Sequence, residues 1–301
     1  MTAVLSMSAA LTAEAAGRTV AAGRPPDAWP TAPADVGDEF RAFAASALDL
    51  VRGEPGYAVL RLGTAGMADH ALTTAAWNLV TTLGRPVPQY RTGELVYPVE
   101  VGASAATVSH YSGTSRAGGF HTDGTLLPQP PDFAVLLGLS AADIGGETVL
   151  VDGAALREAL RADDPRHLAE LRRPHHFDLQ GQQPGVTTRK QAILSDQDGR
   201  FELRYLRRYI ELGHTTAGAQ LPDRLVAAMD LLDELCATPA FQHPVLLERG
   251  DLLVWNNARF LHGRLPFTEI DSKRRLRRIY AVFAPGRPGV RSATGGAHAH
   301  R

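Results

Sequence analysis

Apolar residues recur at helical spacing in four parts of the chain. Between residues 38 and 52 they share one side of an expected helix: Phe40, Phe43, Leu48 and Val51. The same spacing predicts helices over Met67–Leu83, Gly153–Leu171 and Pro222–Ala237. The stretches between these helices follow a different pattern.

Most other apolar residues fall into short runs separated by turns, many of which contain Gly or Pro, and this pattern is typical of β-strands. We expect strands at Tyr57–Leu62, Glu94–Val101, Ala106–Tyr111, Phe133–Leu139, Thr148–Val151, Ala192–Ser195, Val245–Leu247, Leu252–Trp255 and Leu276–Phe283. The helices interrupt these strands without the strict alternation that a parallel sheet requires. The pattern therefore predicts a mixed α/β protein, mainly β, with a sandwich or barrel core and peripheral helices.

Both ends of the chain differ from its middle. Residues 21–36 carry four prolines, so we expect residues 1–36 to form a partly flexible leader with one weak helix. Residues 286–301 are rich in Gly and polar residues and are expected to form a flexible tail, in which the His298 and His300 pair is incidental. Residues 37–285 would then form a single domain.

The composition narrows the class of protein. With 44% hydrophobic and 21% charged residues, the 301-residue chain can bury a sizeable core. A formal net charge of −1 gives no support to binding of nucleic acid or of an anionic membrane. No apolar run approaches the roughly 18 residues of a membrane span, and the N-terminus lacks the basic segment of a signal peptide. The single cysteine, Cys236, allows no intrachain disulfide, so we expect a cytoplasmic protein.

A first group of candidate metal ligands lies in the segment Gly118–Thr125, which reads GGFHTDGT. His121 and Asp123 are two residues apart, so in extended chain both side chains point the same way. An H-x-D tripeptide alone occurs by chance and fits a surface turn equally well. Further candidate ligands elsewhere in the chain are needed to distinguish a metal site from a surface turn.

A third candidate ligand follows a predicted strand near the other end of the chain. The segment Asn256–Arg264, NNARFLHGR, contains His262. Two histidines and one carboxylate on one face of an octahedron leave three positions open, which is the arrangement of non-haem iron(II) oxygenases. His175, His176 and His243 are alternative third ligands, but they lack this sequence context.

A cluster of arginines begins shortly after His262, in the segment Lys273–Arg278. If residues 274–283 form a strand, one face carries Arg274, Leu276, Arg278 and Tyr280, and the other carries Arg275, Arg277 and Ile279. A guanidinium on the inner face could grip the distal carboxylate of a dicarboxylic co-substrate. A solvated or polyanion-binding patch is the alternative, which the near-neutral total charge disfavours.

Taken together, these motifs are similar to those of a known family. The chain resembles the taurine dioxygenase and clavaminate synthase-like group of iron(II)/2-oxoglutarate oxygenases from about Phe40 to Ala284. The resemblance rests on F-H-T-D-G, P-P-D-F-A-V-L-L-G-L, G-G-E-T, G-D-L-L-V-W-N-N-A-R-F-L-H-G-R and R-x-x-x-R, in this order. It implies a double-stranded β-helix, or jelly-roll, core with the iron at one mouth.

The resemblance also implies roles for individual residues. His121, Asp123 and His262 would be the catalytic Fe(II) ligands. Arg274 and Thr148 would bind the distal carboxylate of 2-oxoglutarate, and Arg278 would lie near its C1 carboxylate or the substrate. The choice of Arg274 over Arg275 rests on the R-x-x-x-R register. Related halogenases have a small residue in place of the carboxylate, so Asp123 argues against halogenation.

The expected reaction consumes O₂ and 2-oxoglutarate and oxidises a small molecule. The H-G-R-x-x-F segment resembles members that hydroxylate free or carrier-bound amino acids in specialised metabolism. Desaturation, cyclisation or oxidative cleavage of another substrate stays open, as does a non-catalytic metal-binding jelly-roll, and the sequence does not indicate the oligomeric state. Candidate pocket segments are Gln89–Tyr97, Val108–Ser115 and Phe201–Gly213, with His110 and His214 as candidate lining residues. We expect Arg207 and Arg208 to lie in solvent.

Overall fold

The computed structural model describes residues 3–17, 35–64, 66–89, 93–101, 118–197, 200–271 and 273–283. The helices are α1 (Ala9–Gly17), α2 (Asp38–Arg52), α3 (Asp69–Leu83), α4 (Gly153–Asp163), α5 (Pro165–Leu171), α6 (Arg207–Thr216) and α7 (Asp223–Ala237). None of these helices combines the length and the apolar character that crossing a membrane would need.

The described strands form two main sheets and three small two-stranded sheets. The larger sheet has the order β1-β2-β14-β6-β17-β3, and β4 also pairs with β17. Its strands are β1 (Val4–Ser6), β2 (Tyr57–Arg61), β3 (Gly84–Val87), β4 (Val96–Glu100), β6 (Phe133–Ser140), β14 (Asp251–Asn256) and β17 (Arg275–Phe283). The smaller sheet has the order β13-β8-β15-β5 and contains β5 (Gly118–His121), β8 (Thr148–Asp152), β13 (Gln242–Val245) and β15 (Phe260–Arg264).

Two of the small sheets are hairpins, which pair β9 (Pro174–Asp178) with β10 (Thr188–Ala192) and β11 (Leu194–Gln197) with β12 (Arg200–Leu203). In the third, β7 (Ile144–Gly145) pairs with β16 (Phe267–Thr268), which lies far from it in the sequence. In both main sheets every strand pair is antiparallel except β1 with β2, which is parallel. The described residues therefore form the mixed α/β architecture, rich in strands, that the sequence predicts.

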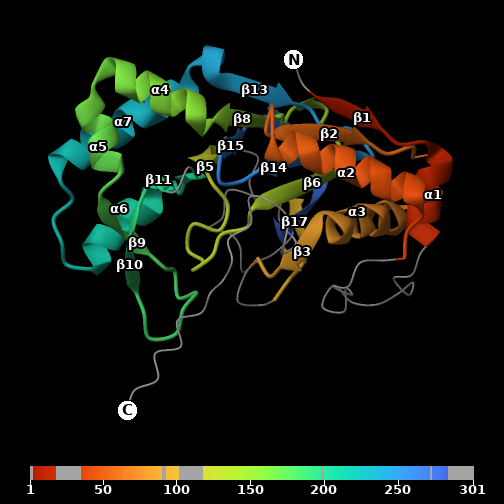
Figure 1. Ribbon diagram of the computed structural model, residues 1–301, viewed down its shortest axis with the longest axis horizontal. Coiled ribbons are helices and arrows are strands. Elements are labelled where there is room, and N and C mark those ends of the chain that lie inside the picture. Colours follow the sequence, from red (N-terminus) through yellow and green to blue (C-terminus); the bar gives the residue numbers. More distant parts are fainter. Residues whose placement is uncertain are drawn as a thin grey trace.

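The alternation of side chains along the strands builds four layers, as Figure 1 shows. On β6, Val135 and Leu137 face a core shared with α1, α2 and α3, whereas Ala134 and Leu136 face the smaller sheet. On β8, Leu150 meets the larger sheet, and its neighbours on the strand pack against α4, α5, α6 and α7. Both sheets are thus covered by helices on their outer faces, and the inner faces enclose the space in which the site lies.

The chain's beginning packs with this core. β1 pairs with β2, and Met7, Leu11 and Ala15 contribute to the core under α2 and α3. These residues belong to the predicted leader, residues 1–36. The division of the chain at residues 36 and 285 stays a prediction, and the predicted tail lies outside the described residues.

The helix predicted over Gly153–Leu171 is wrong in one respect, because it is two helices. Asp164 ends α4 and caps α5, accepting a hydrogen bond of 2.9 Å from the backbone N–H of Arg166. Pro165 has no N–H to continue the first helix and suits the first turn of the second. The chain therefore bends at this point and wraps around the smaller sheet.

Two predicted strands are also misplaced, and a third, Ala106–Tyr111, lies outside the described residues. Of the predicted strand Val245–Leu247, only Val245 lies in a strand, β13, which begins at Gln242 and ends at Val245. This is the edge strand of the smaller sheet, where Pro244 is tolerated and polar residues hide the β pattern. The run Ala192–Ser195 spans the turn between β10 and β11, which belong to different hairpins.

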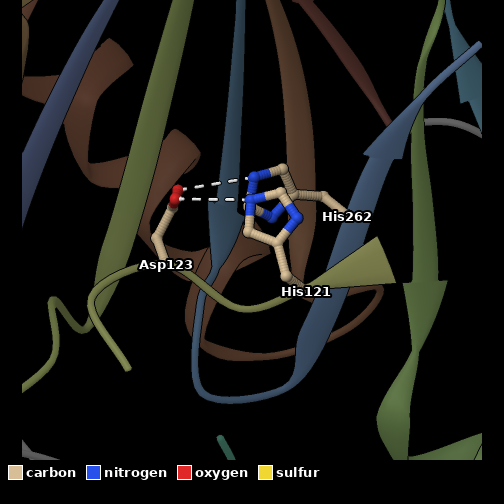
Figure 2. Close-up of side chains that lie close together, drawn as sticks. All are labelled: His121, Asp123 and His262. Carbon is tan, nitrogen blue, oxygen red and sulfur yellow. Dashed lines mark ion pairs between the residues drawn. The ribbon is translucent and has the colours of Figure 1, made fainter. Parts of the chain in front are cut away.

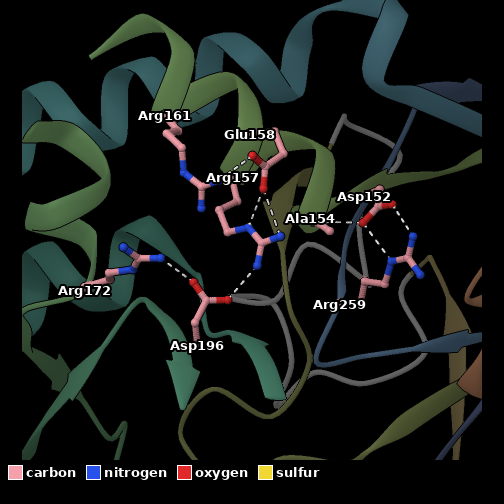
Figure 3. Close-up of polar contacts among 8 residues, drawn as sticks. All are labelled: Asp152, Ala154, Arg157, Glu158, Arg161, Arg172, Asp196 and Arg259. Carbon is pink, nitrogen blue, oxygen red and sulfur yellow. Dashed lines mark hydrogen bonds and ion pairs between the residues drawn. The ribbon is translucent and has the colours of Figure 1, made fainter. Parts of the chain in front are cut away.

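Charged side chains connect the helical layer to the strands (Figure 3). Asp152 caps α4 through the N–H of Ala154 at 2.9 Å and accepts two hydrogen bonds from Arg259, at 2.6 and 2.9 Å. Asp196 joins α4 to the end of α5 through Arg157 and Arg172. The Asp152 pair holds the turn between β14 and β15, and this turn leads to His262.

Candidate active site

The three predicted metal ligands meet between the two sheets (Figure 2). His121 ends β5 and His262 lies opposite it on β15, so the two histidines are a cross-strand pair with ring centroids 4.3 Å apart. Asp123 lies in the turn after β5. Its carboxylate oxygens are 4.0 Å from Nε2 of His121 and 3.5 Å from Nε2 of His262. Within the described residues this is the one cluster of acidic, histidine or cysteine side chains with metal-ligand spacing.

The turn that carries Asp123 is held by residues far away in the sequence. Asn257 accepts a hydrogen bond of 2.8 Å from the Asp123 N–H and donates to the carbonyls of Asp123 and Pro131, both at 3.0 Å. Gly124 follows with φ +67°, and a Cβ there would meet Pro131 at 2.6 Å. The positive φ and the close contact with Pro131 explain why a glycine follows Asp123 in the motif H-T-D-G.

The Asp123 carboxylate is buried and remains charged. Burial acts to raise its pKa, but His262, Arg278 and His121 and a hydrogen bond from the Tyr280 hydroxyl outweigh burial, so the pKa lies below the usual range. Its Oδ2 accepts no hydrogen bond from any described residue. A buried, charged carboxylate oxygen without a hydrogen bond is unfavourable unless a positive group, such as a metal ion, binds it.

Both histidines can offer Nε2 to a metal ion. The Nδ1 of His121 lies 2.9 Å from the carbonyl oxygen of Gly119, and donation there would leave the Nε2 lone pair free. Burial lowers the pKa of His262 to about 3, so its ring is neutral at neutral pH. The Nδ1 of His262 has no hydrogen-bond partner among the described residues, and Trp255 packs against the ring at 4.9 Å between centroids. The donor set therefore fits an iron(II) ion.

The alternative third ligands lie elsewhere. His243 is on β13 and packs against Tyr57, with ring centroids 5.9 Å apart. His175 and His176 are on β9 and lie near His214 of α6, at 6.0 and 5.3 Å between ring centroids. His214 does not line the pocket around the triad, and His110 lies outside the described residues.

The side chains of β17 point to the two faces of the sheet in the predicted alternation. Leu276 and Tyr280 point into the core between the sheets and Ile279 points to the helices, as expected. Arg274, just before the strand, is 5% exposed and lines the pocket, whereas Arg275 forms an ion pair with Asp69 at 2.6 Å. Of the two candidates for the co-substrate anchor, the structure therefore places Arg274 in the pocket.

The G-G-E-T motif makes room for Arg274. Gly146 has φ +84°, and a Cβ there would lie 3.0 Å from Cδ of Arg274. Its carbonyl accepts a hydrogen bond of 3.1 Å from Nε of Arg274, while no described residue bonds the two terminal nitrogens. Burial lowers the pKa of Arg274 to about 10, which leaves it charged at neutral pH. Thr148, buried at the start of β8, lines the same pocket.

The sequence reasoning missed Arg264, which lies two residues after His262. It pairs with Thr148 in the sheet register, and its guanidinium lies 4.9 Å from the Phe267 ring, which Arg274 also contacts at 5.5 Å. The H-G-R spacing could have predicted that Arg264 lies in the pocket with His262, because residues two apart on a strand share a face. Arg278 lies deeper, with Nε 2.8 Å from Oε1 of Gln89 and a guanidinium nitrogen 3.6 Å from Asp123.

These side chains line a pocket of about 1320 Å³, a volume that includes its open mouth. The predicted segments contribute Gln89, Leu206, Arg208 and Tyr209, and Val108–Ser115 lies outside the described residues. Arg208 is exposed as expected but lines the pocket. Arg207 differs from expectation, because it forms ion pairs with Glu211, Asp230 and Asp233. Gln180 and Gln182 complete the mouth and were missed, because they lie in the loop between β9 and β10.

The fold and this site match a known class. A family model described as "Taurine catabolism dioxygenase TauD, TfdA family" matches residues 34–280. The chain therefore belongs to the TauD/TfdA family, and it is an iron- and 2-oxoglutarate-dependent dioxygenase. The resemblance drawn from the motifs is confirmed.

Among curated proteins, the chain is 30% identical over 243 residues to a uridine-5'-phosphate dioxygenase of Amycolatopsis sp, covering 77% of this chain and 86% of that protein. A Streptomyces sp protein of the same name is 29% identical over 181 residues, covering 58% and 65%. Similar solved structures include asparagine oxygenase with Fe(II), 3-hydroxyasparagine and succinate, at TM-score 0.68, 21% identity and 93% of both chains. The non-heme iron oxygenase OrfP with Fe and alpha-ketoglutaric acid gives TM-score 0.67, 18% identity and 94% of both chains.

Proposed function

We propose that this dioxygenase hydroxylates a small polar molecule in the pocket between its two sheets. The observation that carries the proposal is the cluster of His121, Asp123 and His262, which lines the same pocket as Arg274 and in which Asp123 and His262 are buried. One group offers metal ligands with three open positions, and the other offers a cation for a dicarboxylate. This pairing of groups suits an oxygenase that consumes 2-oxoglutarate.

In this proposal His121, Asp123 and His262 hold the Fe(II), which supplies activation of O₂ when bound. The protein keeps His262 neutral by burial and keeps Asp123 charged through its contacts with Arg278 and Tyr280. Asn257 fixes the turn that presents Asp123. These residues set the ligand geometry before any ligand arrives, which reduces the cost of organising the site.

Arg274 and Thr148 are proposed to bind the distal carboxylate of 2-oxoglutarate. The free terminal nitrogens of Arg274 can grip a carboxylate bidentately, and its burial strengthens the interaction by excluding water. We assign Arg278 to the C1 carboxylate or the substrate, because it lies on the same strand face and 3.6 Å from Asp123. We further propose that the two facing sheets form a double-stranded β-helix, as the family membership suggests.

The substrate class has two candidates. The uridine-5'-phosphate dioxygenase relatives favour a nucleotide, and the asparagine oxygenase and OrfP structures favour an amino acid, the class predicted from the H-G-R-x-x-F segment. The Asp123 carboxylate favours hydroxylation over halogenation. Both candidates are small polar molecules, which suits the polar and charged side chains that line the pocket.

The proposal is tested by measuring succinate formed from 2-oxoglutarate with Fe(II) and O₂, with each candidate substrate added in turn. We expect succinate and a hydroxylated product in a one-to-one ratio with one substrate class. Absence of 2-oxoglutarate binding, together with absence of turnover with every candidate, would contradict the proposal.

A further inference from the structure

We infer that the mouth of the pocket is a subsite for a phosphate monoester, and that the substrate is a nucleoside monophosphate held through Arg208. This inference rests on the proposed function and names the substrate class of the same site. It is drawn from the charges that line the pocket and from the partners of the residues at its mouth.

The two neighbouring arginines at the start of α6 have different roles. Arg207 is bound by three carboxylates, those of Glu211, Asp230 and Asp233, at 2.7 to 2.9 Å. Arg208 is exposed, lines the pocket, and makes no hydrogen bond or ion pair with any described residue. Its guanidinium is therefore available to a ligand, and a charged group at the mouth can also attract an anion from solution.

The charges in the pocket favour an anionic substrate. The described lining contains one carboxylate, that of Asp123, and four arginines: Arg208, Arg264, Arg274 and Arg278. The lining therefore has a net charge of three positive charges. Bound Fe(II) and doubly charged 2-oxoglutarate cancel each other, so this excess remains when both are present. Glu147 and Glu269 act on Arg274 through their charges, but neither lines the pocket.

The described lining of the pocket offers no carboxylate, other than the proposed metal ligand, that could pair with the ammonium group of an amino acid. Among the described lining residues Asp123 is the one acid, and it is assigned to the metal. A phosphate monoester carries about −1.5 to −2 charges at neutral pH and offers three acceptor oxygens, which suit a guanidinium.

Gln180 adds a hydrogen-bond acceptor to the same mouth. Its backbone has φ +49°, an uncommon conformation for a residue with a side chain, and Asp178 holds it there. One oxygen of Asp178 accepts from both the N–H and the Nε2 of Gln180, at 2.8 and 2.6 Å, and the other accepts from Thr216 at 2.6 Å. Because a charged carboxylate only accepts, the amide nitrogen of Gln180 faces Asp178 and Oε1 is left for a ligand. A base or ribose can supply the N–H or O–H.

The test measures equilibrium binding to the full-length anaerobic enzyme loaded with Fe(II) and 2-oxoglutarate. The ligands are UMP, CMP, AMP and GMP, their nucleosides, L-asparagine and L-arginine. We expect at least one monophosphate to bind about 10- to 100-fold more tightly than its nucleoside and than either amino acid. Arg208→Gln should remove this difference and leave 2-oxoglutarate binding unchanged. The matched control Arg166→Gln, on exposed α5, should keep the difference.

Two results would overturn the inference. One is that no monophosphate binds more tightly than its nucleoside, and the other is that Arg208→Gln retains the difference. If an amino acid supports succinate formation and no monophosphate does, the proposed function stands and the phosphate subsite fails. If the enzyme neither binds 2-oxoglutarate nor forms succinate, the proposed function itself fails.

Discussion

The inner and outer halves of the pocket are built in different ways. The inner half consists of side chains on or next to paired strands, and three of its polar residues are nearly inaccessible: Asp123 is 3% exposed, Thr148 3% and Arg274 5%. The outer half consists of Arg208 on the first turn of α6 and Gln180 and Gln182 on a loop, where Arg208 and Gln180 are exposed. We assign the metal and co-substrate to the inner half and the substrate's anionic group to the outer half.

This difference indicates how such a fold can keep one chemistry and change its substrate. Strand pairing fixes His121 opposite His262, so moving His121 would disturb β15, and moving His262 would disturb both β5 and β8. The mouth has no such constraint, because helix starts and loops accept substitution without breaking a ladder of hydrogen bonds. Variants in the two halves should therefore affect different ligands.

Of these variants, we expect Arg274→Ala to have the largest effect, and we expect it on the KM for 2-oxoglutarate. Losing the bidentate charged contact should raise the KM for 2-oxoglutarate by about 100-fold. Arg275→Ala removes a neighbouring guanidinium that pairs with Asp69 outside the pocket and should change this KM less than about threefold. Steady-state succinate assays on both variants check the prediction, and the reverse ranking would show that the co-substrate assignment is wrong.

A smaller effect is expected from a residue that contacts no ligand. Asn257→Ala removes three hydrogen bonds to the turn of Asp123 and should weaken Fe(II) binding by about 10-fold or more. The adjacent Asn256→Ala loses only a turn contact to the N–H of Ala258 and serves as the control. Anaerobic Fe(II) titration, with a thermal melt to check folding, measures both. Equal Fe(II) affinity in the two variants would contradict a positioning role for Asn257.

The smallest effect is expected at the mouth. Gln180→Ala removes one neutral hydrogen-bond acceptor from the mouth, together with the hydrogen bond from Nε2 to Asp178. It should raise the substrate KM about two- to tenfold while leaving the KM for 2-oxoglutarate unchanged. Gln183→Ala, in the same loop but outside the pocket lining, is the matched control. A parallel rise in both KM values for Gln180→Ala would mean that the two halves are not independent.

Strand geometry explains why most of the inner half could be predicted from the sequence. The period of two along a strand groups His121 with Asp123 and Arg274 with Arg278, and the glycines of H-T-D-G and G-G-E-T mark turns beside them. Asn257 was missed because its role depends on a contact 134 residues away. Arg207 and Arg208 are adjacent and identical, so only their three-dimensional neighbours separate an ion-paired residue from a pocket residue.

The most direct test of the metal assignment is the weak visible charge-transfer band of the anaerobic complex with Fe(II) and 2-oxoglutarate. The wild-type protein should show this band, and so should Asp163→Ala, a substitution of an exposed aspartate at the end of α4. His121→Ala and Asp123→Ala should each lose it, because each removes a proposed iron ligand. A band of unchanged intensity in either of these two variants would contradict the assignment of the site.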